Sequence, residues 1–131
     1  MTQEHKMLLI KDLSSRLPYA VHVQHISGVS GVLHDISIFH KYDENDNICD
    51  VIRYTDFLGG SIGIEHFKPY LFPLSSMTEE QEKEYNNLNC YELGCFPHSE
   101  EALDYLTKNH FDYRHLIEKG LAIDATGLNI Y

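Results

Sequence analysis

Six consecutive residues near the end of the chain combine side chains that proteins use to move protons. The segment 110–115 reads His-Phe-Asp-Tyr-Arg-His, and histidine and aspartate are common groups in general acid–base catalysis. The segment has no nucleophile beside it and no glycine-rich loop to hold a phosphate. The same residues also suit a structural role, in which Asp112 bonds Arg114 or the backbone and fixes the turn that follows a helix. We favour this structural interpretation, so no catalytic residue is predicted.

Histidines elsewhere in the chain are candidates for metal ligands. His22 and His25 are three residues apart in an expected strand, where they point to opposite faces and cannot readily share one ion. His34, Asp35 and His40 surround an expected hairpin, but no second, well-spaced pair accompanies them. Structural zinc sites are closed sets of four ligands. The sequence therefore predicts neither a metal site nor a cofactor.

The three cysteines, Cys49, Cys90 and Cys95, form no CxxC motif. Cys90 and Cys95 could approach each other across a turn, but a redox pair usually has two intervening residues at a helix N-terminus. We expect the thiols to pack as small apolar groups in a reducing compartment. The chain opens without the basic and apolar regions of a secretory signal, and no apolar run reaches the roughly 18 residues of a membrane span. These features favour a cytoplasmic protein with no membrane contact.

The charge balance bears on the kind of partner. The 131 residues include 20 Asp and Glu but only 10 Lys and Arg, a formal charge of −10, and residues 71–131 hold eleven of the acids and four of the bases. Nucleic-acid binding draws much of its affinity from Lys and Arg that neutralise phosphates. Because no basic cluster occurs, direct binding of nucleic acid is not expected.

The chain also lacks several short motifs of common enzyme classes. GxGxxG, GxxxxGK[ST] and HExxH are all missing, which argues against the usual nucleotide-binding and zinc-protease classes. We therefore expect a protein that is not an enzyme. A small metal-dependent hydrolase, with a site assembled from distant residues, is kept as an alternative.

The first element that must position any site is a helix over residues 3–16. Thr2 suits its N-cap, and Pro18 ends it because proline disfavours the α conformation of the residue before it. Lys6, Lys11, Asp12 and Arg16 fall outside the apolar stripe of the helix, which is made of Leu9, Ile10, Leu13 and Leu17.

Residues 19–74 change to a period of two, with β-branched and aromatic runs separated by glycines and polar turns. Four or five short strands in this stretch predict a small, bent, SH3-like antiparallel sheet or barrel. Pro69 and Pro73 lack the N–H that a central ladder needs, so the stretch between them is expected to be an edge or a connector.

Residues 75–131 are expected to be mainly helical. Thr78 and Gln81 form a capping box for a helix over about 79–88, and Ser99 caps a second helix that ends near Asn109. A short helical turn over 113–119 should stop at Gly120, and 121–125 could form a final strand. The prediction is a single α+β domain over 1–131, composed of the N-terminal helix (1–18), the SH3-like sheet (19–74) and the helical C-terminal part (75–131).

The two aromatic residues between the prolines, Tyr70 and Phe72, give the sequence its one candidate interaction site. A rigid apolar anchor inside a polar rim is typical of protein interfaces. The favoured function is therefore a non-enzymatic interaction module that binds an unidentified protein. Both aromatic side chains could instead close the core of the sheet. An acidic decoy that occupies the basic surface of a nucleic-acid-binding protein is a further alternative.

Three stretches of the chain resemble an uncharacterised family of hypothetical proteins from Bacteroides-type gut bacteria and their phages or prophages. They are residues 67–80 (FKPYLFPLSSMTEE), 110–122 (HFDYR and LIEKGLA around His115), and 8–19 (LLIKDL before RLPY). The resemblance implies an association with a phage or mobile element, but it carries no known activity. The family often has glycine where this chain has His115, so a role for that histidine would not be shared.

Overall fold

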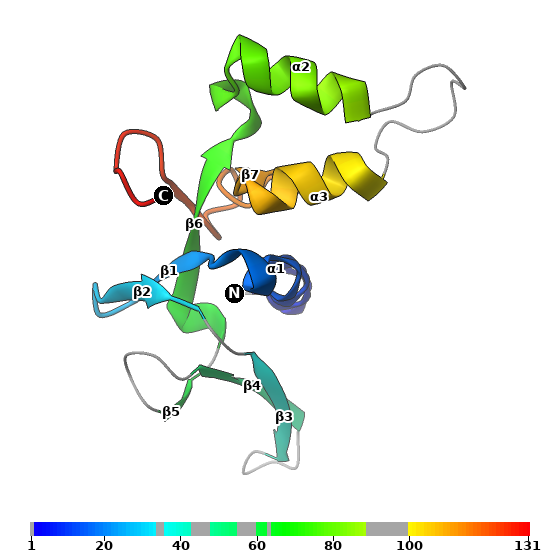
Figure 1. Cartoon of the computed structure of the whole chain (residues 1–131). Coiled ribbons are helices and arrows are strands. Elements are labelled where there is room, and N and C mark those ends of the chain that lie inside the picture. Colours follow the sequence, from blue (N-terminus) through cyan, green and yellow to red (C-terminus); the bar gives the residue numbers. More distant parts are fainter. Residues whose placement is uncertain (1, 34–35, 43–47, 55–59, 63, 89–99) are drawn as a thin grey trace.

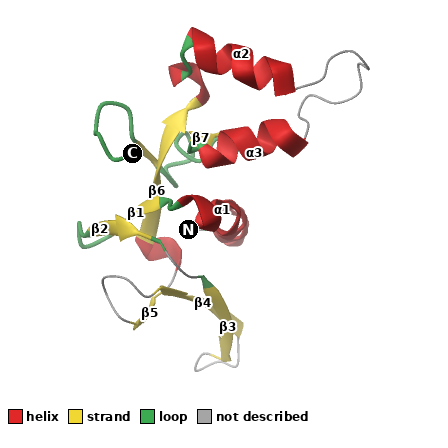
Figure 2. Cartoon of the chain, in the orientation of Figure 1, coloured by secondary structure: helices red, strands yellow, loops and turns green. Residues whose placement is uncertain are grey.

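The computed structural model describes residues 2–33, 36–42, 48–54, 60–62, 64–88 and 100–131. Within these ranges the chain forms three α-helices and two β-sheets (Figure 2). The predicted α+β class is confirmed. Figure 1 shows the helices α2 (Glu79–Leu88), α3 (Glu100–Lys108) and α1 (Gln3–Arg16) one below the other, with the second sheet below them.

Helix α1 (Gln3–Arg16) begins and ends where its sequence predicts. The hydroxyl of Thr2 accepts a hydrogen bond from the backbone N of His5 at 3.1 Å, which satisfies one of the free N–H groups of the first turn. Leu9 and Leu13 are buried in the core. Asp12 and Arg16 are also fully buried, so the prediction that they lie outside the buried face is wrong.

The first sheet is mixed and has the order β2-β1-β6-β7, with β8 pairing β6 as well. The β1 strand is antiparallel to both β2 and β6, whereas β7 and β8 are parallel to β6. The β6 strand therefore joins the early part of the chain to its last part. The strands are β1 (His22–His25), β2 (Ser30–Val32), β6 (Phe67–Pro73), β7 (Phe111–Asp112) and β8 (Ile123–Asp124).

The placement of β6 corrects the expectation that residues between Pro69 and Pro73 form an edge or a connector. Both prolines are odd-numbered, and the odd-numbered positions of β6 face β8, since Ala125 donates from its N to Leu71 O at 2.8 Å. The β8 ladder covers only Tyr70 and Leu71. The missing N–H groups therefore lie on either side of that short ladder, which lets a strand with two prolines occupy a central place.

The second sheet is an antiparallel meander of β3 (Ser37–Tyr42), β4 (Ile48–Tyr54) and β5 (Gly60–Ile62). The stretch 19–74 thus contributes to two sheets rather than one. Among the residues that the structure describes, neither sheet closes, and the SH3-like barrel is not confirmed.

Helices α2 (Glu79–Leu88) and α3 (Glu100–Lys108) pack against each other. The predicted capping box is confirmed, because Thr78 N donates to Gln81 Oε1 and Gln81 N donates to Thr78 Oγ1. Ser99, the expected cap of α3, lies outside the described residues. The chain after β7 forms turns instead of the expected helical turn over 113–119, although Gly120 does adopt a positive φ of 73°.

The core lies between α1 and the first sheet. Apolar side chains from α1, β1, β6 and the turn after β7 are excluded from water there, which is the main driving force for holding these elements together. The members with the least exposure are Leu9, Leu13, Val21, Val23, Ile64, Leu71 and Leu116.

Candidate functional site

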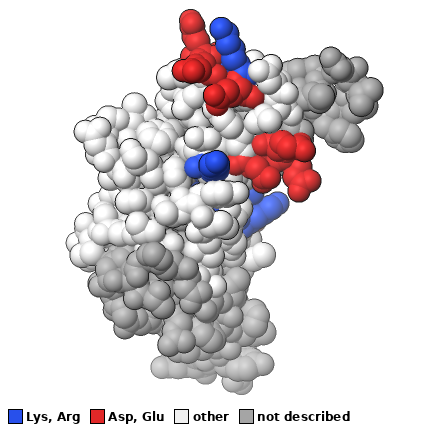
Figure 3. All heavy atoms as spheres, viewed as in Figure 1, with Lys and Arg blue, Asp and Glu red and all other residues white. Residues whose placement is uncertain are grey.

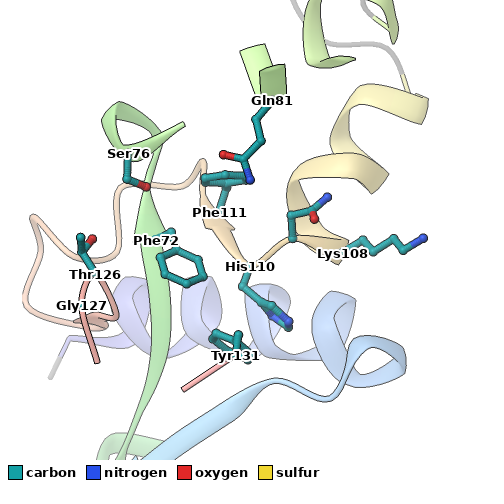
Figure 4. Close-up of a pocket in the computed structure, with 10 residues that line it drawn as sticks. Phe72, Ser76, Gln81, Lys108, His110, Phe111, Thr126, Gly127 and Tyr131 are labelled. Atoms are coloured by element: carbon teal, nitrogen blue, oxygen red, sulfur yellow. The ribbon is translucent and has the colours of Figure 1, made fainter. Parts of the chain in front are cut away.

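A pocket of about 380 Å³ lies where β6, β7, the end of α3 and the last residues of the chain meet. This volume falls in the range of small-ligand sites, which is roughly 300–1,000 Å³. Figure 4 shows aromatic rings around the pocket, with polar side chains from α2 and α3 above them. The residues that line it are Phe72, Ser76, Gln81, Lys108, Asn109, His110, Phe111, Thr126, Gly127 and Tyr131.

The ring of Tyr131 organises the aromatic side of this pocket. It stacks on His110 with 3.7 Å between ring centroids and 11° between planes. The ring also meets His22 edge-on at 4.9 Å and Phe72 at 5.8 Å. The edge-on contact with His22 is a geometry that aromatic rings prefer, whereas the rings of Tyr131 and His110 lie nearly face to face. We call Tyr131, His110 and His22 the aromatic cluster.

The hydroxyl of Tyr131 makes two hydrogen bonds with main-chain atoms. It accepts from the backbone N of His22 at 2.9 Å and donates to the carbonyl oxygen of Tyr70 at 2.8 Å. Although 42% of the residue is exposed, this end of the side chain lies between strands. Burial raises the pKa of Tyr131 to about 12, so the phenol stays protonated and keeps its donor.

His110 supports the Tyr131 ring from a strained backbone position. Its φ is 63°, in the left-handed region that few non-glycine residues adopt. The residue is 9% exposed, and its Nδ1 atom is buried without a protein partner. Burial, with smaller contributions from Arg16 and His22, lowers its pKa to about 4. His110 is therefore neutral near pH 7 and can present a ring face to a ligand without the cost of desolvating a charge.

The rim of the pocket is polar. Ser76 Oγ donates to Pro73 O at 2.6 Å and Asn109 Nδ2 donates to Tyr105 O at 2.9 Å, so both side chains are held in place. Lys108 is exposed and extends outward in Figure 4. Among the described residues that line the pocket, none is acidic.

The acidic and basic residues of the segment 110–115 serve the fold. The two carboxylate oxygens of Asp112 accept from the backbone N atoms of Leu116 and Ile117, each at 2.9 Å. The expected bond from Asp112 to the backbone is confirmed. His115 is exposed, and its Nδ1 lies 3.6 Å from a carboxylate oxygen of Glu118. The segment therefore fixes a turn, as the structural interpretation predicts.

Arg114 completes a second group of polar residues, which we call the ionic cluster: Asp12, Arg16 and Arg114. The carboxylate of Asp12 accepts from Arg16 Nε at 2.8 Å and from Arg114 Nη1 at 2.7 Å. Arg16 also donates to the carbonyl oxygen of Phe111 at 2.6 Å. The Arg114 guanidinium lies 4.5 Å from the ring centroid of Tyr113, a cation–π distance. This cluster joins α1 to β7.

The two predicted anchor residues have different environments. Tyr70 is 6% exposed, and its hydroxyl lies 2.9 Å from Ser30 Oγ. Phe72 is half-buried and lines the pocket, with Tyr131 and Phe111 beside it. Phe72 is therefore the member of the pair that a ligand can reach.

Of the remaining candidates that the structure describes, His22 contacts the pocket residue Tyr131 but does not line the pocket, and His25 lies away from it. His25 pairs locally with Ser27, whose Oγ lies 2.8 Å from His25 Nδ1, whereas His22 contacts Tyr131. Cys90, Cys95, His34 and Asp35 lie outside the described residues. Within the part of the chain that the structure describes, no three His, Cys, Asp or Glu side chains are placed to hold a metal ion.

Most of the pocket could not be identified from sequence. Gln81 carries a signal, but that signal is for helix capping. Tyr131 carries none, because a single tyrosine after Gly-Leu-Asn-Ile forms no periodic pattern and no motif. No protein-family model, curated protein or solved structure matches this chain. The helices that the structure describes include none with the length and apolarity to cross a membrane.

Proposed function

We propose that this chain is a non-enzymatic binding module whose pocket beside Phe72 accepts a side chain from a protein partner. The observation that carries the proposal is the pocket itself, in which stacked aromatic rings stand beside a rim of hydroxyl and amide groups. Interfaces concentrate binding energy where an aromatic anchor fills a water-excluding pocket with a polar border. Catalysis has no comparable support, because His110 and Tyr131 face each other with no nucleophile between them.

The proposal can be tested by filling the pocket. Thr126 is exposed and lines it, so Thr126→Trp should block entry while leaving the core intact. Lys119→Trp places the same side chain at an exposed position outside the pocket and is the matched control. Each full-length variant, and the unmodified chain, would be used to capture proteins from a lysate of Bacteroides-type bacteria, the source that the sequence resemblance suggests.

The proposal expects at least one protein to be captured by the unmodified chain and by Lys119→Trp, but about tenfold less by Thr126→Trp, a difference of about 1.4 kcal/mol. Equal capture by all three would contradict it. Phe72→Ala should reduce the same capture, because it removes the aromatic wall.

A second candidate, the acidic decoy, has one supporting observation. Figure 3 shows acidic side chains gathered over the helical end of the molecule. The first turn of α2 contains Glu79, Glu80 and Glu82, and the first turn of α3 contains Glu100 and Glu101. Such a surface attracts basic partners at low ionic strength. The decoy expects the chain to displace DNA from a DNA-binding protein of the same lysate at low salt and not at high salt. If the chain does not displace DNA at low salt, the decoy function is contradicted.

The proposed relationship to phage and prophage proteins rests on the three sequence stretches and on one backbone angle. His115 has a φ of 59°, a conformation that glycine adopts without steric cost. A family that often has glycine at this position would therefore fit the same backbone.

A further inference from the structure

One edge of β6 shows why Tyr131 is placed where it is. The register between β1 and β6 pairs Val23 with Pro69 and Gln24 with Lys68, and Ile26 N donates to His66 O at 2.9 Å. Even-numbered residues of β1 therefore turn their N–H groups toward β6. One further step in the same register brings His22 opposite Tyr70.

At the pair His22 and Tyr70, the hydroxyl of Tyr131 takes the place of a direct hydrogen bond between β1 and β6. His22 N donates to the hydroxyl of Tyr131, and the hydroxyl donates to Tyr70 O. The next even-numbered position, Phe72, donates from its N to His110 O at 2.8 Å, where β7 begins. Tyr131 thus fills a gap of one position in the ladder, between the end of β1 and the start of β7.

The gap has the chemistry of a specific binding site. It offers one donor, the N–H of His22, and one acceptor, the carbonyl of Tyr70, to a single atom that must both accept and donate. Beside that atom, His110 provides a face on which an aromatic ring can stack, and Phe72 provides a tilted ring contact. A protonated phenol meets all of these requirements. A benzyl group lacks the hydroxyl, and a phosphorylated phenol has lost the donor.

The segment that carries Tyr131 has few other attachments among the described residues. Leu128 is 50% exposed and Asn129 has a φ of 52°. The backbone N atoms of Thr126 and Leu128 donate to Asp124 Oδ1 and Ala125 O, which belong to the residues directly before the segment. Tyr131 as a whole residue remains 42% exposed, and it borders the pocket. The side chain of Tyr131 therefore holds the segment 126–131 against the sheet, and it lies where an incoming ring can compete with it.

We propose that the gap between β1 and β7 is a phenol-binding site, that Tyr131 is its resident occupant, and that a tyrosine of a protein partner can take its place. This inference rests on the proposed binding function and names the side chain that is recognised. The pocket beside Tyr131 gives the partner's tyrosine its route to the gap.

The test empties the site and offers it a free phenol. In Tyr131→Ala, p-cresol should bind in a ligand-observed NMR titration and raise the melting temperature, because a vacated aromatic cavity takes up a matching small molecule. Toluene, which has the same ring and methyl group without the hydroxyl, should bind at least ten times more weakly, the value of about one net hydrogen bond. The unmodified chain and Leu128→Ala, in which Tyr131 is retained, should bind p-cresol at least ten times more weakly than Tyr131→Ala.

Equal affinity of folded Tyr131→Ala for p-cresol and toluene would overturn the inference, and so would failure to bind either. If Tyr131→Ala does not fold, Tyr131→Phe carries the test, because it keeps the ring and removes the hydroxyl. Hydrogen exchange of the His22 amide should then accelerate at least tenfold while that of Gln24 stays unchanged. Unchanged protection of His22 would overturn the inference.

These measurements are independent of the capture experiment. Binding of p-cresol without any effect of Thr126→Trp on capture would support the phenol-binding site and contradict the binding of a protein partner at the pocket. Capture that depends on the pocket, without binding of p-cresol, would support the binding function and contradict a tyrosine as the group that is recognised.

Discussion

The ionic cluster and the aromatic cluster connect the same two parts of the chain, the first through buried charges and the second through neutral rings. Each links residues 12–22 to residues 110–131 across the first sheet. Asp12 and Arg16 have no exposed surface, and their charges depend on each other and on Arg114. The aromatic cluster contains neutral groups, and the ring of Tyr131 borders the pocket.

The difference separates a permanent connection from one that can be exchanged. Breaking a buried ion pair leaves a charge without compensation, which is strongly unfavourable. Displacing a neutral phenol costs only hydrogen bonds and ring contacts, and an equivalent group can replace them. The ionic cluster therefore suits the attachment of α1, and the aromatic cluster suits recognition.

The largest effect is expected from the ionic cluster. Asp12→Ala would leave the buried guanidinium of Arg16 without its carboxylate, and we expect it to lower the free energy of unfolding by about 3–5 kcal/mol. Urea denaturation followed by circular dichroism measures this change. Asp104→Ala, at an exposed position of α3, should stay within about 0.5 kcal/mol. If Asp12→Ala lowers the free energy of unfolding by less than 1 kcal/mol, the ionic cluster is not the permanent connection that we describe.

A smaller effect is expected when the hydroxyl of the aromatic cluster is removed. Tyr131→Phe keeps the ring but deprives His22 N and Tyr70 O of their partner, which should cost about 2 kcal/mol. The same denaturation experiment applies. A cost equal to that of Asp12→Ala would mean that the aromatic cluster is as indispensable to the fold as the ionic one.

Acidification should weaken the aromatic cluster through His110. Its pKa is about 4 in the folded chain and about 6.5 when unfolded. Above pH 6.5 neither state binds the proton. As the pH falls from 6.5 toward 4, the unfolded chain takes up a proton that folded His110 does not, and stability is lost. The slope cannot exceed about 1.4 kcal/mol per pH unit, the value for one proton.

His110→Asn isolates this contribution, since asparagine tolerates the left-handed backbone of position 110. The free energy of unfolding of each protein would be measured between pH 7 and pH 4.5. The variant should lose less stability over that range than the unmodified chain does. Identical profiles would show that His110 is protonated equally in both states.

The smallest expected effect lies outside both clusters, at His115. His115→Gly should relieve the cost of a φ of 59°, and the gain is limited to about 1 kcal/mol because glycine also loses more conformational entropy on folding. His115→Ala retains the Cβ and should give no gain. Thermal unfolding of both variants measures this difference, and stabilisation by alanine alone would refute the backbone explanation.

The parts of the fold that could be predicted depend on near neighbours in the sequence. The Thr2 cap, the capping box of Thr78 and Gln81 and the positive φ at Gly120 follow from spacings of a few residues. The burial of Asp12 could not be predicted, because a carboxylate in a polar stripe normally faces water. Its burial requires Arg114, which lies 102 residues away in the chain.

The candidate site shows the same division. Sequence reasoning selected Phe72, which does line the pocket, but it also selected Tyr70, which lies in the core. An alternating strand puts neighbouring even-numbered residues on one face, yet a sequence alone does not say how much of that face its neighbours cover.

The sequence by itself determined the α+β class, the capped helices and the acidic balance of residues 71–131, since each depends on composition or on contacts within one turn. Only the tertiary structure decided that Arg16 and Asp12 are buried and that Tyr131 stands between β1 and β7. The physical reason is that a hydrogen bond depends on distance and direction between two groups. For groups about 100 residues apart, these are set by strand register, which becomes fixed when the sheet forms.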